Sequence, residues 1–383
     1  MKKNRVSKGY MLNTIIIVLL FTAFQLLTAR QGGEDFFKLV LAPGLWQCCY
    51  LVVLAASLNL VLGYLGQLSL GHCGFMAVGA YTAALLSLAC ERAGVFEDKT
   101  GAAFILVLFG CILAAGLLSA LVGLLVGIPA LRLKGDYLAI ITLGFGMIIV
   151  NIINNLPFCG QNGLEQGSAA ASLYKNGLGF GSRDKVAFLW TALLVTVICL
   201  TLMFMFVRSK YGRAIRAIRD DEIAASASGI NTSHYKVLTF AISAFFAGVA
   251  GALYACANAT LSTSSFAFTN GGILNSTFVV VMVVLGGMGS LTGSIAAAVI
   301  MFFVNYQIKN GAWVAALPAS LSGIFEYPML VYALILIIVI MFRPMGIFGS
   351  YEFSLVNLRA DIKKRAEAKK TERAERKGVK GNG

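Results

Sequence analysis

Residues 102–127 read AAFILVLFGCILAAGLLSALVGLLVG, a run of 26 residues without a charged side chain. A helix needs about 20 mostly apolar residues to cross the hydrocarbon core of a bilayer, so this run predicts a membrane-spanning helix. The whole chain has the same character, because 58% of its 383 residues are hydrophobic and only 13% are charged. Soluble domains carry about 25% charged residues. The composition therefore excludes a soluble enzyme and a disordered chain.

Similar apolar runs predict an all-α polytopic membrane protein with about ten transmembrane helices. The run 274–308 is too long for one helix, and Gly286-Gly287-Met288-Gly289 divides it into a shorter and a longer span. The first run exceeds a typical signal-peptide core and no Ala-x-Ala-like site follows it, so we interpret it as a helix. The predicted spans are residues 11–29, 44–62, 68–89, 102–127, 137–156, 186–207, 237–257, the two parts of 274–308, and 320–342.

Lysines and arginines predict how these spans are oriented. Four lie in the basic N-terminus (1–10), two in 132–134, six in 208–236 and eleven from Arg343 onward, which together are 23 of the 31 in the chain. Because cytoplasmic loops carry an excess of Lys and Arg, this distribution places both termini in the cytoplasm. The net charge of +14 is concentrated beside apolar spans, so it indicates contact with anionic lipid and not with nucleic acid.

The predicted organisation is a transmembrane domain over residues 11–349, between the basic N-terminus and a charged cytoplasmic tail, 350–383. The tail is rich in Lys, Arg, Glu and Ala, as a solvated helix or a disordered segment is, and we interpret it as a charged surface. The longest exterior loop, 157–185, is rich in Gly, Ser and Asn. The eight cysteines lie mostly inside apolar runs, without the spacing of a metal site.

Sequence motifs for catalysis and nucleotide binding are missing. The chain has no Gly-x-x-x-x-Gly-Lys-[Ser/Thr], His-Glu-x-x-His or Gly-x-Ser-x-Gly, so we expect no catalytic residue, no metal site and no cofactor in it. The predicted spans are almost free of charge, whereas ion-coupled transporters usually carry ionisable residues there. A pore whose energy comes from a partner is therefore favoured over an ion-coupled secondary transporter.

Several uncharged polar residues lie at membrane depth. Each needs a partner in hydrocarbon, and so it bonds to a neighbouring helix or contacts a substrate. The stretch 59–75 is the better candidate for a substrate path, because its four glycines would open the backbone. The predicted path residues, Phe75 among them, are Asn59, Gln67, Ser69, His72, Phe75, Thr142, Asn275 and Ser276.

A faint internal repeat joins residues 63–71 to residues 286–293, since both contain closely spaced glycines followed by Ser-Leu or Leu-Ser. Each would lie at a cytoplasmic break between helices. Transporters often contain such repeats, and their broken helices tend to line the path. Chance recurrence among 41 glycines is the alternative.

The strongest functional signal is the polar stretch 211–231, which lies between two predicted spans and has helical character. Arg213, Arg216 and Arg219 are three residues apart, so they follow one side of a helix. A basic loop that lies on lipid is the alternative, but the length and the ordered pattern favour a docking helix. The small residues that leave room for close contact or a turn are Ala224, Ala225 and Gly229.

This stretch also resembles a known family. Glu222-x-Ala-Ala225-x-x-x-Gly229 is similar to the cytoplasmic Glu-Ala-Ala loop with which permeases of ABC importers dock on their ATPase subunits. More specifically, the chain resembles the longer permease of the branched-chain amino acid importers (LivM-type). The matching stretches, in family order, are 59–75 (NLVLGYLGQLSLGHCGF), 79–81 (GAY), 131–146 (LRLKGDYLAIITLGFG), 160–164 (GQNGL), 213–231, 285–290 (LGGMGS) and 343–349 (RPMGIFG).

The resemblance implies an ABC importer permease fold in which residues 208–236 form the cytoplasmic ATPase-docking segment. It implies four kinds of partner besides lipid: a homologous second permease subunit, two ATP-binding subunits that carry ATP and Mg, and an extracytoplasmic substrate-binding protein. The docking residues that it implies are Arg213, Arg216, Arg219, Asp221, Glu222, Ala225 and Gly229.

The implied function is to form the translocation path for branched-chain or related hydrophobic amino acids in a bacterial cell (inner) membrane. A permease of the same superfamily for an amide, a pentose or a nucleoside remains an alternative, as does an ion-coupled transporter. Three positions depart from the family pattern. Met147 and Val150 replace an acidic residue and an arginine, and Pro328 replaces the arginine of a Glu-Tyr-Arg pattern, which bears on substrate choice.

Overall fold

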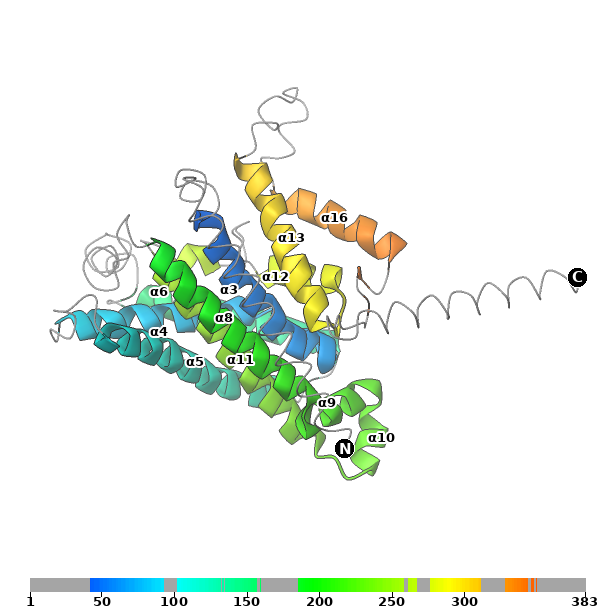
Figure 1. The fold of residues 1–383 in the computed structure, drawn as a ribbon. Coiled ribbons are helices and arrows are strands. Elements are labelled where there is room, and N and C mark those ends of the chain that lie inside the picture. Colours follow the sequence, from blue (N-terminus) through cyan, green and yellow to red (C-terminus); the bar gives the residue numbers. More distant parts are fainter. Residues whose placement is uncertain are drawn as a thin grey trace, which may run out of the picture. The chain divides into compact units, whose positions relative to one another are not determined.

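The computed structural model describes residues 42–92, 102–156, 185–257, 261–266, 276–310 and 328–349, without positions 132, 134, 344, 345 and 348, and also Cys159. These ranges are helical and contain no strand (Figure 1). The long helices are α3 (Ala42–Asn59), α4 (His72–Arg92), α5 (Ala102–Ala130), α6 (Asp136–Asn155), α8 (Lys185–Arg208), α11 (Thr232–Ala257) and α13 (Leu291–Asn310). The shorter elements are the π-helical η2 (Leu60–Tyr64), α9 (Lys210–Asp220), α10 (Glu222–Ala227), the 3-10 turn η4 (Thr263–Phe266), α12 (Ser276–Gly286) and α16 (Pro328–Phe342).

Nine of the ten predicted spans coincide with helices in the described ranges, and the remaining one, 11–29, lies outside them. Among the described residues, α3 to α6, α8 and α11 are long and apolar enough to cross a membrane. Helices α12, α13 and α16 have shorter apolar lengths. The number ten and the cytoplasmic placement of both termini stay predictions. The exterior loop 157–185 and the tail 350–383 lie outside the described residues, apart from Cys159 and Lys185.

The structure differs from the prediction at the start of the third span. Helix α3 continues through the π-helical turn η2, residues 66–71 are not helical, and α4 begins only at His72. Gly66 has a φ of +75°, a left-handed conformation that favours glycine. The glycines therefore do break the helix, as the sequence indicates, but the break is longer than predicted.

Helix α3 occupies the centre of the described bundle. It packs against α8, α11, α12 and α13, while α11 also packs against α4 and α5 (Figure 1). Helix α16 contacts α12. The residues of α3 from Cys48 onward are buried. Through its contacts on all sides, α3 joins the group around α11 to the group formed by α12, α13 and α16.

Small residues bring α4, α5 and α11 close together. A side chain at Gly79 would collide with the backbone of Gly248, and one at Gly251 would collide with the Met76 carbonyl. Ser119 of α5 donates a bifurcated hydrogen bond from Oγ to carbonyl oxygens of α4 and α11, at 2.9 and 2.8 Å. Helices pack in this way in membranes, where close van der Waals contact replaces the hydrophobic effect.

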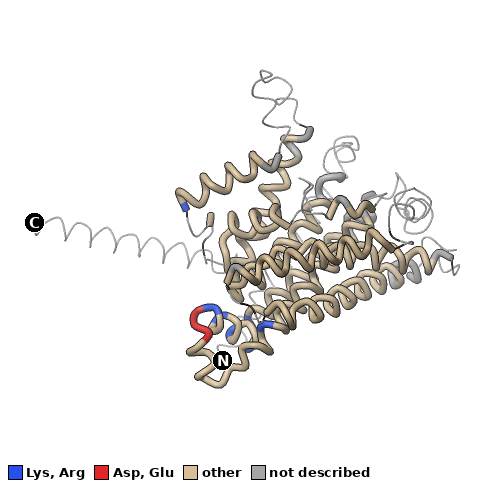
Figure 2. Tube along the Cα trace, turned by 180° about the vertical axis from the view of Figure 1, so that it is seen from behind, with Lys and Arg blue, Asp and Glu red and all other residues tan. Residues whose placement is uncertain are grey.

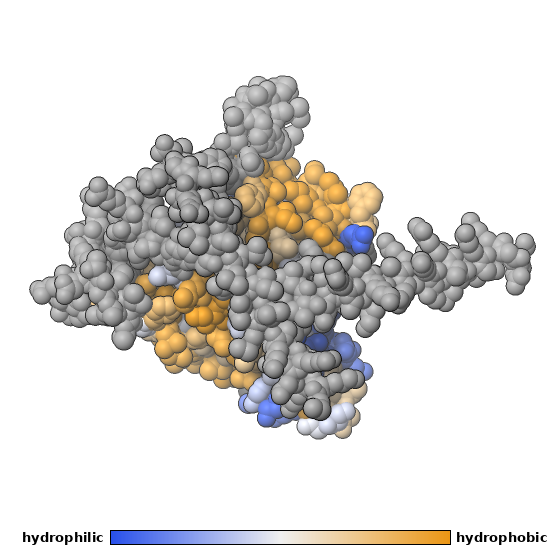
Figure 3. Space-filling model, in the orientation of Figure 1, coloured by the Kyte–Doolittle hydropathy of each residue, from blue (hydrophilic) through white to orange (hydrophobic). Residues whose placement is uncertain are grey.

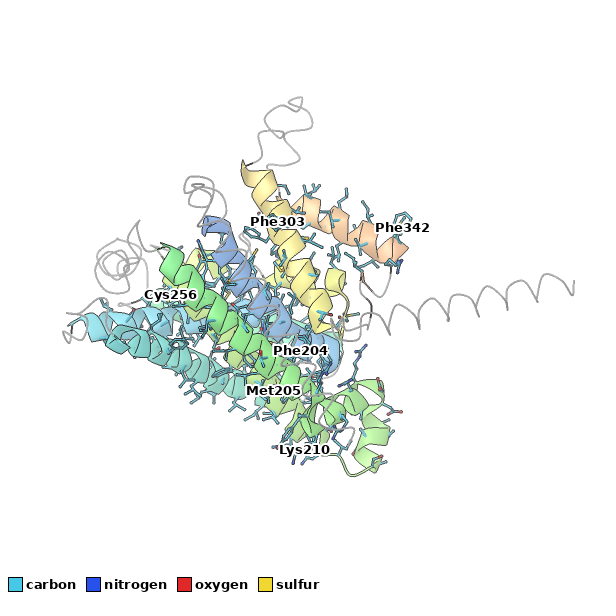
Figure 4. All side chains as sticks on the ribbon, in the orientation of Figure 1. Phe204, Met205, Lys210, Cys256, Phe303 and Phe342 are labelled. Carbon is cyan, nitrogen blue, oxygen red and sulfur yellow. The ribbon has the colours of Figure 1, made fainter. Side chains whose placement is uncertain are left out.

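The surface of the described bundle is apolar except at one end. Large exposed apolar side chains lie on α5, α6, α8 and α16, for example Leu125, Ile140, Met205 and Met341. Figure 3 shows apolar surface on the visible parts of this bundle. Charged side chains gather instead around α9 and α10 (Figure 2). Lys210, at the start of α9, and Cys256, near the end of α11, mark opposite ends of the bundle (Figure 4). An apolar belt with a polar end is the surface expected of a membrane-spanning bundle.

Candidate functional site

The predicted docking segment, residues 208–236, folds as two short helices between α8 and α11. Ser209 caps the first helix, α9, because its Oγ accepts hydrogen bonds from the N–H groups of Tyr211 and Gly212. Asp221 directly follows the last residue of α9 and caps α10. Its Oδ1 accepts hydrogen bonds from Ile223 N at 2.8 Å and from Ala224 N at 3.0 Å. Capping at both starts fixes the angle between the two helices.

Helix α9 is amphipathic, as the spacing of its arginines predicts. Arg213, Arg216 and Arg219 are exposed, whereas the opposite face is buried. That face consists of Gly212, Ile215 and Ile218. Gly212 lies so close to the Val207 backbone that a side chain there would collide with it. The segment is therefore seated on the end of the bundle by an apolar face and presents a basic one.

The three arginines have different contacts. Arg213 Nη1 is 3.5 Å from the Arg208 carbonyl. Arg216 donates from Nη2 to the Val207 carbonyl at 2.8 Å, and its guanidinium lies 5.8 Å from the centre of the Tyr64 ring. Arg219 reaches furthest, because Nη1 donates to the Gly63 carbonyl at 2.6 Å. Two of the three arginines thus contact η2.

Helix α10 is tied to α11 by one ion pair. Glu222 accepts from Lys236 Nζ at 2.6 Å, and the Lys236 side chain is only 6% exposed. A buried ammonium needs such a partner. Ala225 is buried, and its carbonyl accepts a hydrogen bond from Ile230 N. Gly229 turns the chain with a φ of +82°.

The structure places the predicted docking residues on two sides of the segment. Ala225 faces this chain's own fold, and Gly229 serves the turn after α10. The large apolar side chain most exposed in the described residues is Ile223, at 82%. Sequence reasoning did not select it. A single isoleucine between Glu222 and Ala224 in a six-residue helix carries no periodic signal.

Two glycine-rich breaks that are distant in the sequence meet in the structure. Asn59 donates from Nδ2 to the Ser290 carbonyl at 2.9 Å, and its Oδ1 accepts from Gly289 N at 3.1 Å. Gly63 also lies against the Gly289 backbone. We call residues 59–66 together with 286–290 the helix junction. Its two halves overlap the two copies of the faint internal repeat, 63–71 and 286–293, and Gly63 of the first copy lies against Gly289 of the second.

Four of the eight predicted path residues, Asn59, His72, Thr142 and Ser276, form hydrogen bonds with distant parts of the chain. Leu70 N donates to Thr142 Oγ1 at 3.1 Å, and Cys73 N donates to Ser276 Oγ at 3.2 Å. His72 Nε2 lies 2.7 Å from Ser57 Oγ. The Ser57 hydroxyl also donates to the Leu54 carbonyl at 2.8 Å. These polar groups hold the non-helical segment 66–71 and the start of α4 in place.

Two predicted path residues keep unpaired polar atoms. Gln67 Oε1 and Ser69 Oγ are buried and have no hydrogen-bond partner within the described residues. A buried polar atom without a partner is costly, so such atoms call for a functional or structural explanation. Phe75 is buried edge-to-face against Phe240, with ring centroids 5.5 Å apart. Asn275 lies outside the described residues.

Further contacts between helices come from residues that the sequence did not single out. Ser243 Oγ donates to the Ser57 carbonyl at 2.6 Å, and Tyr332 Oη donates to Asn305 Oδ1 at 2.6 Å. The second contact joins α13 to α16. Within the described residues, no group of three or more His, Cys, Asp or Glu side chains comes together to hold a metal ion.

The departures from the family pattern have local consequences. Val150 is buried in α6, where a charged side chain would need a partner. Pro328 is the first residue of α16. Proline suits that position, since its fixed φ matches the helix and it has no N–H that needs a partner. Pro328, where the family pattern has an arginine, therefore begins α16. Glu326 and Tyr327 lie outside the described residues.

The apolar bundle, its broken helices and the polar segment at one end define a multi-pass helical membrane protein. Comparison with protein families then gives its place among such proteins. Residues 40–341 match the family described as branched-chain amino acid transport system / permease component. The chain belongs to this family.

Curated relatives agree with this assignment. The high-affinity branched-chain amino acid transport system permease protein LivM of Salmonella typhimurium is 35% identical over 316 residues, which cover 77% of this chain and 67% of the relative. The probable LivM of Methanocaldococcus jannaschii is 24% identical over 332 residues, with coverage of 79% and 91%. The permease LivH of Salmonella typhimurium is 26% identical over 321 residues, with coverage of 79% and 92%. No solved structure matches the chain.

The first prediction concerns Asn59. Replacing it in Asn59→Ala removes two hydrogen bonds and leaves the Gly289 N–H without its partner, whereas the Ser290 carbonyl still accepts from Ser294 N. An unsatisfied group costs about 1–3 kcal/mol, so we expect unfolding in detergent, followed by circular dichroism, to show a clear loss of stability. Asn151→Ala on the exposed face of α6 is the control and should change little. Equal stability of the two variants would contradict the role given to Asn59.

Proposed function

We propose that this chain is one of two path-forming permease subunits of an ATP-driven importer for branched-chain amino acids. The observation that carries the proposal is the docking segment, an ordered pair of polar helices seated on one end of an apolar bundle beside the helix junction. Family membership supports it, because the family is defined as the permease component of a transport system and not as a complete transporter.

The exposed apolar side chain of Ile223 supports a protein partner at this end. Ile223 follows the charged Glu222 in the first turn of α10 and is 82% exposed, so burial in a hydrophobic pocket of a partner would be favourable. The proposed occupant is an ATP-binding subunit, and we propose two per transporter. ATP and Mg belong to those subunits, and this chain carries neither. In this arrangement α9 and α10 lie in the cytoplasm, and the membrane is the bacterial inner membrane.

A second permease subunit follows from the relatives. The chain is similar both to LivM and to LivH, two differently named permeases of high-affinity branched-chain amino acid transport systems. Two homologous permeases in one system suggest a pair that shares one path. The exposed apolar side chains of α5 and α6 suit contact with lipid and with such a subunit. An extracytoplasmic binding protein would deliver the substrate to the opposite end.

The proposed substrate is a branched-chain amino acid such as leucine. The names of the relatives suggest this class, and the path residues are polar without being charged. We propose that the unpaired Gln67 Oε1 and Ser69 Oγ meet the polar groups of the passing amino acid. An amide oxygen accepts from an ammonium group, and a hydroxyl can also donate to a carboxylate.

Competition for uptake tests the substrate class. Cells that express this chain with its transport system should take up labelled leucine, and cells that lack only this chain should not. Excess isoleucine and valine should suppress the uptake, whereas a simple amide, a pentose and a nucleoside should not, because they lack the paired ammonium and carboxylate. Chain-dependent uptake of one of the latter solutes, without uptake of leucine, would refute the substrate proposal.

Substitution of Ile223 tests the docking proposal. Ile223→Asp should fold normally, since the side chain is exposed and acidic residues are favourable in the first turn of a helix. It should abolish co-purification of the ATP-binding subunits, because a charge would be buried in an apolar pocket. The conservative Ile223→Leu should retain them. If the ATP-binding subunits co-purify with both variants, α10 is not their docking site.

A further inference from the structure

Arg219 contacts both halves of the helix junction. Its Nη1 donates to the Gly63 carbonyl at 2.6 Å. A Cβ atom added to Gly289 would come within 2.8 Å of the same nitrogen, and one added to Gly66 would come within 2.9 Å of Arg219 Cγ. The side chain thus runs from the docking segment across the first break and ends at the second.

The glycines make this approach possible. Gly66 and Gly289 have φ values of +75° and +90°, which residues with side chains rarely adopt. The missing side chains also leave the room that the arginine fills. At Gly66 and at Gly289, the positive φ and the missing side chain both allow Arg219 to approach the backbone. The two breaks therefore fit Arg219 as well as each other.

The electrostatics of the site suit a guanidinium. Gly63 lies in the last turn of the helix formed by α3 and η2, and residues 287–289 follow the end of α12. The last carbonyl groups of a helix lack intrahelical partners and carry partial negative charge. Arg219 donates to one such carbonyl and lies against the other break. A hydrogen bond from a charged donor is also stronger than a neutral one.

The other end of Arg219 is fixed to the docking segment. Its neighbour Asp220 ends α9, and Asp221 begins α10 through two hydrogen bonds. Arg216, one turn earlier, contacts the Val207 carbonyl and the Tyr64 ring. Displacement of α10 therefore moves α9, and α9 holds the junction through Arg219.

We propose that Arg219 is the positioning residue through which the docking segment controls the helix junction. Binding of nucleotide to the ATP-binding subunits displaces α10, and the Arg219–Gly63 contact carries that displacement to the two breaks beside the path. The inference rests on the proposed function, because it takes α10 to be docked on those subunits. It adds the residue that joins docking to transport.

The test uses the complete transporter in proteoliposomes and measures leucine transported per ATP hydrolysed. Arg219→Gln should still co-purify with the ATP-binding subunits and hydrolyse ATP, while leucine per ATP falls about tenfold, as loss of a charged hydrogen bond predicts. Arg219→Lys keeps the charge and should lose less. Lys210→Gln removes the same charge from the same helix without touching the junction, and should keep the wild-type ratio.

Hydrogen exchange of residues 285–291 supplies a readout that loss of stability alone would not move. In the wild-type complex, addition of nucleotide should change the protection of this peptide. In Arg219→Gln the protection should be the same with and without nucleotide. A wild-type nucleotide response in this variant would overturn the inference.

An unchanged ratio of leucine to ATP in Arg219→Gln would also overturn it, and so would loss of the ATP-binding subunits, since Arg219 would then act in docking. If Arg219→Gln does not fold, the ratio of leucine transported to ATP hydrolysed is measured in Arg219→Lys, and an unchanged ratio there overturns the inference. If no ATP-binding subunit accompanies even the wild-type chain, the proposed function itself fails, and the inference with it.

Discussion

The structure depends on the two hydrogen bonds with which the Asn59 amide closes the helix junction. A broken helix leaves backbone groups without partners, and hydrocarbon offers none, so a break within a membrane is stable only where other parts of the protein satisfy it. One amide side chain can contact two backbone groups because it both donates and accepts: it satisfies the Gly289 N–H and adds a hydrogen bond to the Ser290 carbonyl, which also accepts from Ser294 N. Asn59 does so across 230 residues of sequence and thereby joins the central helix α3 to the start of α13.

Other polar side chains also form hydrogen bonds to backbone groups of distant segments. Thr142 and Ser276 satisfy backbone N–H groups around the non-helical segment 66–71, and Ser119 bonds to two helices at once. Polar residues at membrane depth are thus used mainly to hold irregular backbone in position. Gln67 and Ser69 differ from them, because they retain buried atoms without partners in the described residues. Among the seven predicted path residues that the structure describes, this distinction leaves Gln67 and Ser69 as the proposed substrate contacts.

Composition and periodicity predicted most of the described fold. Apolar runs located nine helices, and the spacing of Arg213, Arg216 and Arg219 predicted the exposed face of α9. The contact between Arg219 and Gly63 could not be predicted, since no local pattern records a pairing across 156 residues. The start of α4 was missed because the segment 68–71 is apolar enough to read as helix. Ala225 was assigned to docking from a motif, and only packing shows that it faces inward.

The central claim is that this chain forms a path driven by ATP that partner subunits hydrolyse. Labelled leucine uptake in cells with and without the chain tests it most directly, under ATP depletion and, separately, under a protonophore at maintained ATP. The account predicts that chain-dependent uptake stops on ATP depletion and continues with the protonophore, because the described spans offer almost no ionisable group for proton coupling. Uptake that continues without ATP and collapses with the protonophore would contradict it.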